Sequence, residues 1–415
     1  MSTLATDGQA EPLVVRSREI LDPGELLSLL PDSPEALAWV HGGDGIVGWG
    51  RAAVFRPEGP SRFEDADDWW AEIVASSVVR DELELPGTGL VAFGSFTFTG
   101  APGSVLIVPE VVVGRRDGRS WITTIGRSLG AAPDLVHATP TDPVDTSFVD
   151  DEDRRAAWSA TVERAVRRIQ SGELDKVVLA RSVDAEFATP LDVRSPLTRL
   201  SRTYPGCWTF HVDGFFGSTP EMLLRLDGGL VTSRVLAGTI RRTGDDARDL
   251  SLAASLARSS KDLEEHEYAV RSVADALAPH CTGMNVPEAP FVLHLPNVMH
   301  LATDVTGVLR DDSGALGLVA SLHPSAAVGG TPTADAVRVI AEIEDLDRGR
   351  YAGPVGWIGA SGDGEWGIGL RSAQLTIDRR GARMFAGCGI VADSSPADEL
   401  AEADAKLIPV RGALS

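Results

Sequence analysis

Residues 387–406 read GCGIVADSSPADELAEADAK, and they combine two glycines, five acids and a lysine within a few helical turns. Gly387 and Gly389 flank Cys388 in a segment that predicts a short strand. A strand with two glycines carries little side-chain bulk, so its backbone can approach a small ligand closely. We therefore expect the backbone N–H groups of this strand to face an anion.

A helix is predicted to begin at Pro396 and to continue at least to Lys406. Pro suits the first turn of a helix, and Glu399, Glu402 and Lys406 recur at spacings that place them on one helical face. The plainer interpretation is that Glu402 and Lys406 form a solvated ion pair, which contributes only about 0.3–0.5 kcal/mol. Two acids and an amine on one face are also what a site for a charged ligand needs.

Lysine is rare in this chain. Only Lys176, Lys261 and Lys406 occur among the 38 basic residues, and each lies in a dense motif. Arginine serves equally well for surface charge, whereas lysine offers a compact ammonium group that burial can neutralise. The three lysines are therefore candidates for chemistry.

The composition predicts a globular protein that does not bind nucleic acid. Of the 415 residues 43% are hydrophobic, which is sufficient for a large core, and the formal net charge is -22. Nucleic acid or an anionic membrane would require a basic face that this composition hardly supplies. An anionic substrate would need a locally positive site.

The sequence also predicts a cytoplasmic protein. Its three cysteines, Cys207, Cys281 and Cys388, are too few and too scattered for a disulfide framework, which fits a reducing compartment. Residues 1–12 are polar, are predicted to be disordered, and lack the basic and apolar regions of a signal peptide. No stretch approaches the ~18 uninterrupted apolar residues of a membrane-spanning helix.

Groups of strand patterns alternate with helix patterns, which predicts an α+β fold with large, packed, mostly antiparallel sheets and helices outside. The part up to about residue 150 is mainly strand, with one helix near residues 63–79. Residues 151–415 carry the motifs. We expect residues 13–415 to form a single catalytic domain.

Three predictions concern elements that carry motifs in the second part. Lys176 opens a strand that continues to Val183. Residues 249–278 predict one long helix, and it contains SSKDLEEHEYAV. The segment WGIGLRSAQL, residues 366–375, predicts one strand.

Several acids have the chemistry of a metal site. Glu265, Glu399 and Glu402 offer hard oxygen ligands from two predicted helices. Such ligands suit Mg²⁺, which takes one or two carboxylates together with waters and substrate. Spacing alone is weak evidence for a metal.

Other residues could bind and transform a carboxylate substrate. The guanidinium group of Arg371 is suited to bind a carboxylate through two hydrogen bonds. Lys176 and Glu221 form a candidate pair of base and acid. Each has an ordinary alternative: Arg371 as a strand cation, Glu221 as an acid in a turn, and His300 as a buried core histidine.

Eight motifs, in this order, resemble those of the chorismate-utilising enzymes, and most closely those of the isochorismate synthases. They are DKVVLAR (175–181), GSTPE (217–221), LAGT (236–239), SSKDLEEHE (259–267), LHPSAAVGG (322–330), YAGPVGW (351–357), GLRSA (369–373) and the stretch 387–406. The resemblance covers roughly residues 38–412. It implies the α+β fold of that family.

The resemblance also implies roles. Glu265 and Glu402 would hold Mg²⁺, with Glu399 close by or bridging through water. Lys176 would be the general base and Glu221 the general acid. The substrate would be surrounded by Gly238, Thr239, His300, Tyr351, Arg371, Lys406 and the backbone at Gly387 and Gly389.

The implied reaction converts chorismate to isochorismate for menaquinone or siderophore biosynthesis. Mg²⁺ and Lys406 would neutralise the ring carboxylate, and Arg371 with Tyr351 would hold the enolpyruvyl carboxylate. Water would attack C2 while the C4 hydroxyl departs. A base must be partly neutral and an acid partly protonated, and burial favours both uncharged forms.

Other branches of the family resemble the chain less. Anthranilate and aminodeoxychorismate synthases take ammonia from a glutaminase subunit and usually have Gln at the position of Lys176; the latter have a nucleophilic lysine at the position of Ala237. Salicylate synthases share Lys176 and Glu221 but eliminate pyruvate, and usually have Thr at the position of Ala327. A non-catalytic chorismate-binding relative is the alternative of another class. We expect no glutaminase partner and a monomer.

Overall fold

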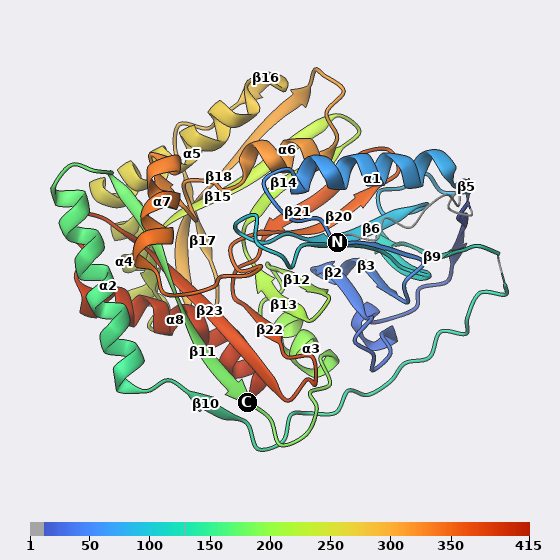
Figure 1. Ribbon diagram of the computed structural model, residues 1–415, viewed down its shortest axis with the longest axis horizontal. Coiled ribbons are helices and arrows are strands. Elements are labelled where there is room, and N and C mark those ends of the chain that lie inside the picture. Colours follow the sequence, from blue (N-terminus) through green and yellow to red (C-terminus); the bar gives the residue numbers. More distant parts are fainter. Residues whose placement is uncertain (1–11, 129) are drawn as a thin grey trace, which may run out of the picture.

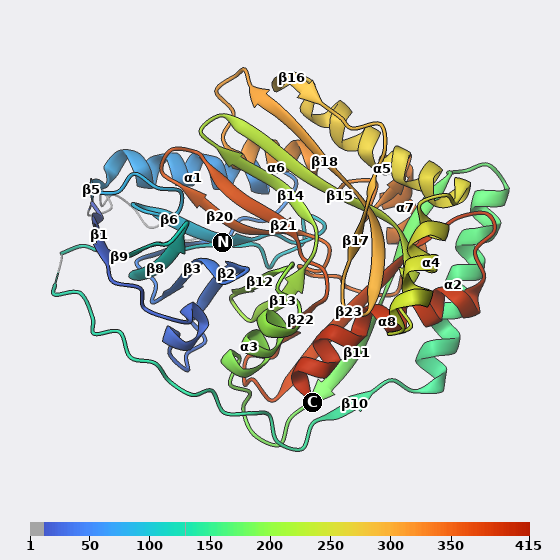
Figure 2. The same ribbon diagram turned by 180° about the vertical axis from the view of Figure 1, so that it is seen from behind.

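The computed structural model describes residues 12–128 and 130–415, without the side chain of Lys261. The predicted disordered N-terminus, residues 1–12, lies outside this description except for Pro12. Two large β-sheets form the centre, and helices lie outside them (Figures 1 and 2). This arrangement confirms the predicted α+β fold. Among the described residues, no helix is both long and apolar enough to cross a membrane.

The first sheet has 13 strands in the order β10-β11-β23-β22-β13-β12-β2-β3-β8-β9-β1-β5, with β19 beside β11. Its strands are β1 Val14–Ile20, β2 Leu37–His41, β3 Asp44–Trp49, β5 Val78–Asp81, β8 Val111–Arg116, β9 Arg119–Gly126, β10 Ser147–Val149, β11 Lys176–Glu186, β12 Trp208–Val212, β13 Phe215–Thr219, β19 Gly330–Thr331, β22 Ser372–Leu375 and β23 Gly381–Ile390. The described strands pair antiparallel, except that β1 runs parallel to β5.

The second sheet has 10 strands in the order β16-β18-β15-β14-β21-β20-β6-β7-β4, with β17 beside β18. Its strands are β4 Ala53–Phe55, β6 Val91–Ser95, β7 Val105–Val108, β14 Met222–Asp227, β15 Leu230–Arg241, β16 Cys281–Asn285, β17 Phe291–His294, β18 Val298–Leu309, β20 Pro354–Gly359 and β21 Gly364–Ile368.

The helices are the short 3-10 helix η1 Leu26–Leu29, then α1 Arg62–Ser76, α2 Glu152–Gln170, α3 Arg194–Thr203, α4 Asp246–Leu256, α5 Ser260–Leu277, α6 Ala315–Leu322, α7 Thr333–Ile343 and α8 Pro396–Leu414. Helices α2, α4, α5 and α7 gather at one end of the molecule, far from β5 and β9 (Figures 1 and 2). The candidate site described below lies among the elements at that end.

Each sheet is built from strands of both parts of the chain, which join edge to edge. In the first sheet β2 pairs with β12, and in the second β6 pairs with β20. Side chains such as Trp39, Phe93 and Trp357 pack together in a buried cluster formed by strands of both sheets. Because neither half has a complete sheet of its own, we propose that residues 13–415 act as a single domain.

The prediction of one helix over residues 249–278 is wrong, because two helices occupy this region. α4 ends at Leu256 and α5 begins at Ser260. The side chain of Ser259 accepts a hydrogen bond from the backbone N–H of Asp262, which makes Ser259 the N-cap of α5. The serine pair that precedes Lys261 is thus a helix start.

The prediction of one strand over residues 366–375 is also wrong. β21 ends at Ile368 in the second sheet, and β22 begins at Ser372 in the first. Arg371 lies between them with a φ of 48°, a left-handed conformation that non-glycine residues rarely adopt. The chain therefore passes from one sheet to the other at Gly369–Arg371.

Candidate active site

Two neighbouring passages of the chain between the sheets position Glu221 and Arg371. β13 leaves the first sheet at Thr219 and β14 enters the second at Met222, while β21 and β22 make the return passage. The two passages are bonded to each other: Ile368 N–H donates to Glu221 O at 3.1 Å, and Ser218 N–H donates to Arg371 O at 3.2 Å. Glu221, the candidate acid, and Arg371, the candidate residue for binding a carboxylate, are thus held side by side by backbone segments that connect the two sheets.

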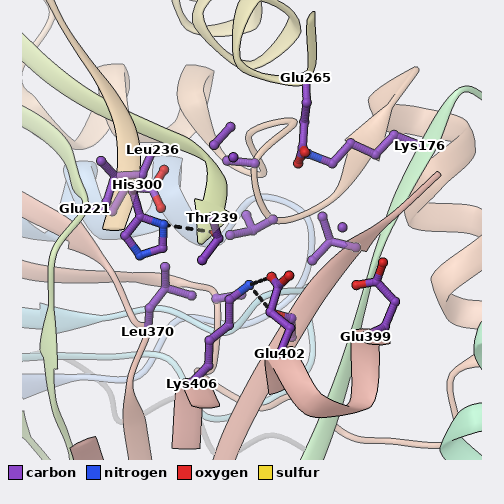
Figure 3. A pocket seen from close by; sticks show the side chains of 18 of the residues that line it. Lys176, Glu221, Leu236, Thr239, Glu265, His300, Leu370, Glu399, Glu402 and Lys406 are labelled. Carbon is purple, nitrogen blue, oxygen red and sulfur yellow. Dashed lines mark hydrogen bonds and ion pairs between the residues drawn. The ribbon is translucent and has the colours of Figure 1, made fainter. Parts of the chain in front are cut away.

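A cavity of about 280 Å³ opens beside these passages. All thirteen predicted site residues line it: Lys176, Glu221, Gly238, Thr239, Glu265, His300, Tyr351, Arg371, Gly387, Gly389, Glu399, Glu402 and Lys406. They come from β11, β15, β18, β23, α5, α8 and the loops between them. Figure 3 shows Lys176 and Glu265 on one side of the cavity, Glu221 and His300 on another, and the glutamates of α8 below.

Burial raises the pKa of Glu221 to about 7 from its ordinary value of 4.5. The carboxyl is only 5% exposed. A backbone hydrogen bond at Leu236 and the charges of Arg371 and Lys176 act in the opposite direction but are outweighed. Glu221 can therefore carry a proton near neutral pH, as a general acid must.

His300 connects Arg371 to Thr239. Arg371 Nη2 lies 3.2 Å from His300 Nε2, and His300 Nδ1 lies 3.0 Å from Thr239 Oγ1. Burial lowers the pKa of His300 well below its ordinary value, with the charge of Arg371 acting in the same direction. Since a guanidinium can only donate, Nε2 accepts and Nδ1 carries the proton. The hydroxyl proton of Thr239 is then available to a ligand in the cavity.

Two lysines form short ion pairs with the candidate metal ligands. Lys176 Nζ lies 2.6 Å from Glu265 Oε1, and Lys406 Nζ lies 2.6 Å from Glu402 Oε1. Lys406 also donates to Gly387 O at 2.9 Å. Burial acts to lower the pKa of Lys406, but the charge of Glu402 outweighs it and the pKa is raised. Lys406 is thus a permanent cation of the site.

Three acids on two helices could hold a divalent cation. Glu399 and Glu402 come within 4.8 Å of each other and of Cys388, and Glu265 faces them from α5. Ser394 Oγ donates to Glu399 Oε1 at 2.7 Å and orients that carboxylate. Burial raises the pKa of the Cys388 thiol well above its ordinary value, so the thiol stays neutral. The remaining donors are hard carboxylate oxygens, which fit Mg²⁺.

Gly387 and Gly389 leave room for side chains as well as for a ligand. A Cβ at Gly389 would lie 2.7 Å from Lys176 Cε and 3.1 Å from Glu265 Oε1, and a Cβ at Gly387 would lie 2.9 Å from the hydroxyl of Tyr351. These distances are shorter than carbon contacts allow. Bare backbone at both positions is therefore required for the lysine, the glutamate and the tyrosine to occupy the cavity wall.

The backbone groups of Gly389 point away from β11. Its partner on β11, Val178, donates its N–H to Gly329 O at 2.9 Å, which lies on the other side of that strand. In an antiparallel pair that is not hydrogen-bonded, both residues direct their N–H groups outward. On that side, the pairing of β22 with β23 begins only at Phe385. The N–H of Gly389 thus faces an open sheet edge, as expected for contact with an anion.

Thr239 and Tyr351 are placed by local backbone features. A bulge between Ala237 and Thr239 interrupts the pairing of β15 with β18, and Gly238 within it has a φ of 78°. Thr239 is thereby brought opposite His300. Tyr351 stacks on Phe385 with ring centroids 5.2 Å apart, and burial raises its pKa to about 12.

The sequence reasoning missed Arg348, which also lines the cavity. Its guanidinium donates to both carboxylate oxygens of Glu344, at 2.6 and 2.7 Å, and to Val178 O at 2.7 Å. It therefore fixes β11 next to Lys176. The sequence offered one indication of this role: Arg348 lies three residues before Tyr351, at the edge of the YAGPVGW motif.

Comparisons with known proteins agree with this geometry. A family model described as "Chorismate binding enzyme" matches residues 19–415. The protein belongs to the chorismate-binding enzyme family. It is 31% identical over 404 residues to "Isochorismate synthase MenF" of Bacillus subtilis, an alignment that covers 89% of this chain and 85% of the relative.

Two further members of the chorismate-binding family are similar. "Isochorismate synthase DhbC" of Bacillus subtilis is 39% identical over 257 residues, which is 59% of this chain and 64% of the relative. The solved structure of the menaquinone-specific isochorismate synthase MenF of Escherichia coli superposes with a TM-score of 0.81, at 25% identity, over 98% of this chain and 95% of that one. The predicted resemblance is confirmed.

Proposed function

We propose that the protein is an isochorismate synthase, which isomerises chorismate to isochorismate. Its relatives bear that name, and its family is the chorismate-binding enzymes. The observation that carries the mechanism is the buried carboxyl of Glu221, with a pKa of about 7, in a cavity that Lys176 also lines. An acid is thus available at neutral pH.

Positive groups on two sides of the cavity would bind the two carboxylates of the substrate. Arg371 offers a guanidinium that His300 orients, with the Tyr351 hydroxyl on the same cavity wall. Lys406 and the outward N–H of Gly389 lie near the α8 glutamates. Bidentate and charge-assisted contacts of this kind fix a planar diacid in one orientation.

Lys176 and Glu221 would then act on opposite faces of the ring. Lys176, in its uncharged form, takes a proton from a water molecule as the oxygen bonds to C2, and both conjugated double bonds of the ring shift by one position, so that the bond from C4 to its hydroxyl oxygen breaks. Glu221 gives its proton to the C4 hydroxyl, which leaves as water. The hydrogen bond to Glu265 Oε1 holds the amine of Lys176 at one side of the cavity throughout.

Glu265, Glu399 and Glu402 would hold Mg²⁺. When bound there, the ion would neutralise the ring carboxylate of the substrate and fix its orientation. The proposal is supported by the ion pairs of two of these carboxylates with Lys176 and Lys406, because a carboxylate that pairs with an ammonium group is ionised. We also propose that the protein works as a monomer and without a glutaminase subunit.

A single assay tests the function. Purified protein with Mg²⁺ and chorismate should produce isochorismate, identified by chromatography. Lys176→Met and Glu221→Gln should fold with unchanged circular dichroism and produce it at least about a hundredfold more slowly. Release of pyruvate would instead identify a salicylate synthase, an ammonia-dependent product would identify the anthranilate branch, and binding of chorismate without turnover would identify a non-catalytic relative.

A further inference from the structure

A second and larger cavity, of about 910 Å³, lies on the other side of Arg348. Strands β11, β23, β22 and β12 of the first sheet (Figures 1 and 2) contribute residues to it, as do the turn at Asp213–Gly214 and the loops near residues 97–103 and 347–350. None of its functional groups takes part in the reaction proposed above. Arg348 alone lines both cavities.

An Asp-Gly turn places one carboxylate among three arginines in the second cavity. Asp213 and Gly214 connect β12 to β13 with φ values of 51° and 79°, the left-handed pair typical of a tight hairpin turn. Asp213 then accepts hydrogen bonds from Arg51 at 3.1 Å, Arg56 at 3.0 Å and Arg350 at 2.8 Å.

This cluster carries more positive than negative charge. Arg350 is satisfied by Asp213 and by backbone carbonyls, whereas the side chains of Arg51 and Arg56 are 29% and 51% exposed. Glu35 approaches Arg51 only to 3.6 Å and is itself 44% exposed. Of the other arginines that line the cavity, Arg348 is paired with Glu344, Arg379 with Asp32 and Arg383 with Asp184, so the positive surplus is confined to the cluster around Asp213. Such a local surplus attracts an anion.

A buried histidine in the same cavity has an unused acceptor. His211 is 1% exposed, and its Nδ1 lies 2.6 Å from Ala36 O. Since a carbonyl can only accept, Nδ1 carries the proton and Nε2 presents a lone pair. Among the described residues, that Nε2 has no hydrogen-bond partner. A buried acceptor without a partner is costly, so a hydroxyl donor from a ligand would be favourable there.

The floor of the cavity is apolar. Val193, Leu375 and Ala382 line it and are buried against the core. His211 lies on β12 and Asp213 in the turn that follows it, so their Cα atoms are about 7 Å apart. A ring of benzene size spans this distance with a carboxylate at one end and a hydroxyl at the other.

We propose that this second cavity binds a small aromatic carboxylate with a hydroxyl group at the far end of its ring. The carboxylate contacts Arg51 and Arg56, the hydroxyl donates to His211 Nε2, and the ring lies on Leu375 and Ala382, whose side chains share the sheet face of His211. The proposal does not depend on the reaction catalysed in the other cavity.

Calorimetric titration of the full chain with three probes tests this site. We expect 4-hydroxybenzoate to bind about tenfold more tightly than 4-hydroxybenzyl alcohol, which lacks the charge, and severalfold more tightly than benzoate, which lacks the hydroxyl. Absence of measurable 4-hydroxybenzoate binding would overturn the proposal.

Matched variants locate the probe. Arg56→Gln removes one exposed charge of the cluster and should weaken 4-hydroxybenzoate binding about tenfold. Arg80→Gln, at a 72% exposed arginine of β5, should leave it unchanged. Loss of binding in Arg371→Gln would place the probe in the other cavity and refute the site, as would an equal loss in Arg80→Gln. The preference for 4-hydroxybenzoate over benzoate should disappear in His211→Phe.

Discussion

The two cavities on either side of Arg348 differ in how their charges are balanced. In the candidate active site, four cationic side chains face six acids, and two of its lysines are each paired with a glutamate at 2.6 Å. In the second cavity the carboxylate of Asp213 is shared by three arginines, two of which are partly exposed. From this difference we expect that the first cavity needs an additional cation to bind a diacid, whereas the second would bind an anion unaided.

Removal of metal should separate the two cavities most strongly. We expect EDTA to reduce isochorismate formation at least about a thousandfold, since a bound cation contributes several kcal/mol of charge stabilisation. Binding of 4-hydroxybenzoate should be unchanged in the same sample. Added Mg²⁺ should restore turnover, and Arg56→Gln should turn over chorismate at the normal rate. Full activity in EDTA would contradict the charge argument.

Glu221→Gln should lower kcat about a hundred- to a thousandfold, because the amide cannot protonate the leaving hydroxyl. The same variant should be the more stable protein at pH 8. The pKa of Glu221 is raised from 4.5 to about 7 in the folded state, so its proton favours folding. Denaturant titrations should give a difference of about 3 kcal/mol.

The size of this stability difference depends on pH. The stability that Glu221 contributes is fully present below about pH 4.5 and is lost as the pH rises through about 7. Wild type and Glu221→Gln should therefore have similar stability at pH 4.5 and diverge up to about pH 7. A pH-independent difference would show that the carboxyl is not buried as described.

The turnover rate should depend on pH through the proton of the Glu221 carboxyl. We expect kcat to fall about tenfold per pH unit above pH 7, as Glu221 becomes ionised. Binding of 4-hydroxybenzoate to the second cavity should not change between pH 7 and 9, because its arginines stay charged. A pH profile measured at saturating chorismate, with calorimetry at the same pH values, compares the two cavities directly.

The smallest expected effect concerns the strand that faces α8. Gly389→Ala should lower turnover about tenfold, since the new Cβ would displace Lys176 and Glu265. Gly412→Ala provides the control, because nothing lies within 4 Å of a Cβ there and a helical alanine stabilises by up to about 1 kcal/mol. Equal activity of both variants would show that Lys176 has more room than its contacts indicate.

The sequence predicted the residues of the site better than the path of the backbone between them. The motif order placed all thirteen candidates, and the structure brings them into one cavity. Their roles stay predictions. The sequence also predicted the strand that begins at Lys176 and the helix that begins at Pro396. Both could be predicted because glycine and proline mark the ends of such elements within a few residues.

The passages between the sheets could not be read from the sequence. Residues 366–375 have the apolar content of a strand throughout, and only pairing with β14 and β13 shows that β21 and β22 belong to different sheets. The second cavity was also missed, because Asp213 meets Arg51, Arg56 and Arg350 from separate parts of the chain. Long-range contacts of this kind leave no local pattern.

The position of α8 has a consequence for synthesis. β23 lies between β11 and β22 inside the first sheet, and α8, which supplies Glu399, Glu402 and Lys406, follows every other element of the site in the chain. While these two elements are still within the ribosome, β11 lacks its neighbour and the cavity lacks one wall. A nascent chain therefore cannot complete the cavity before residue 406 has left the ribosome.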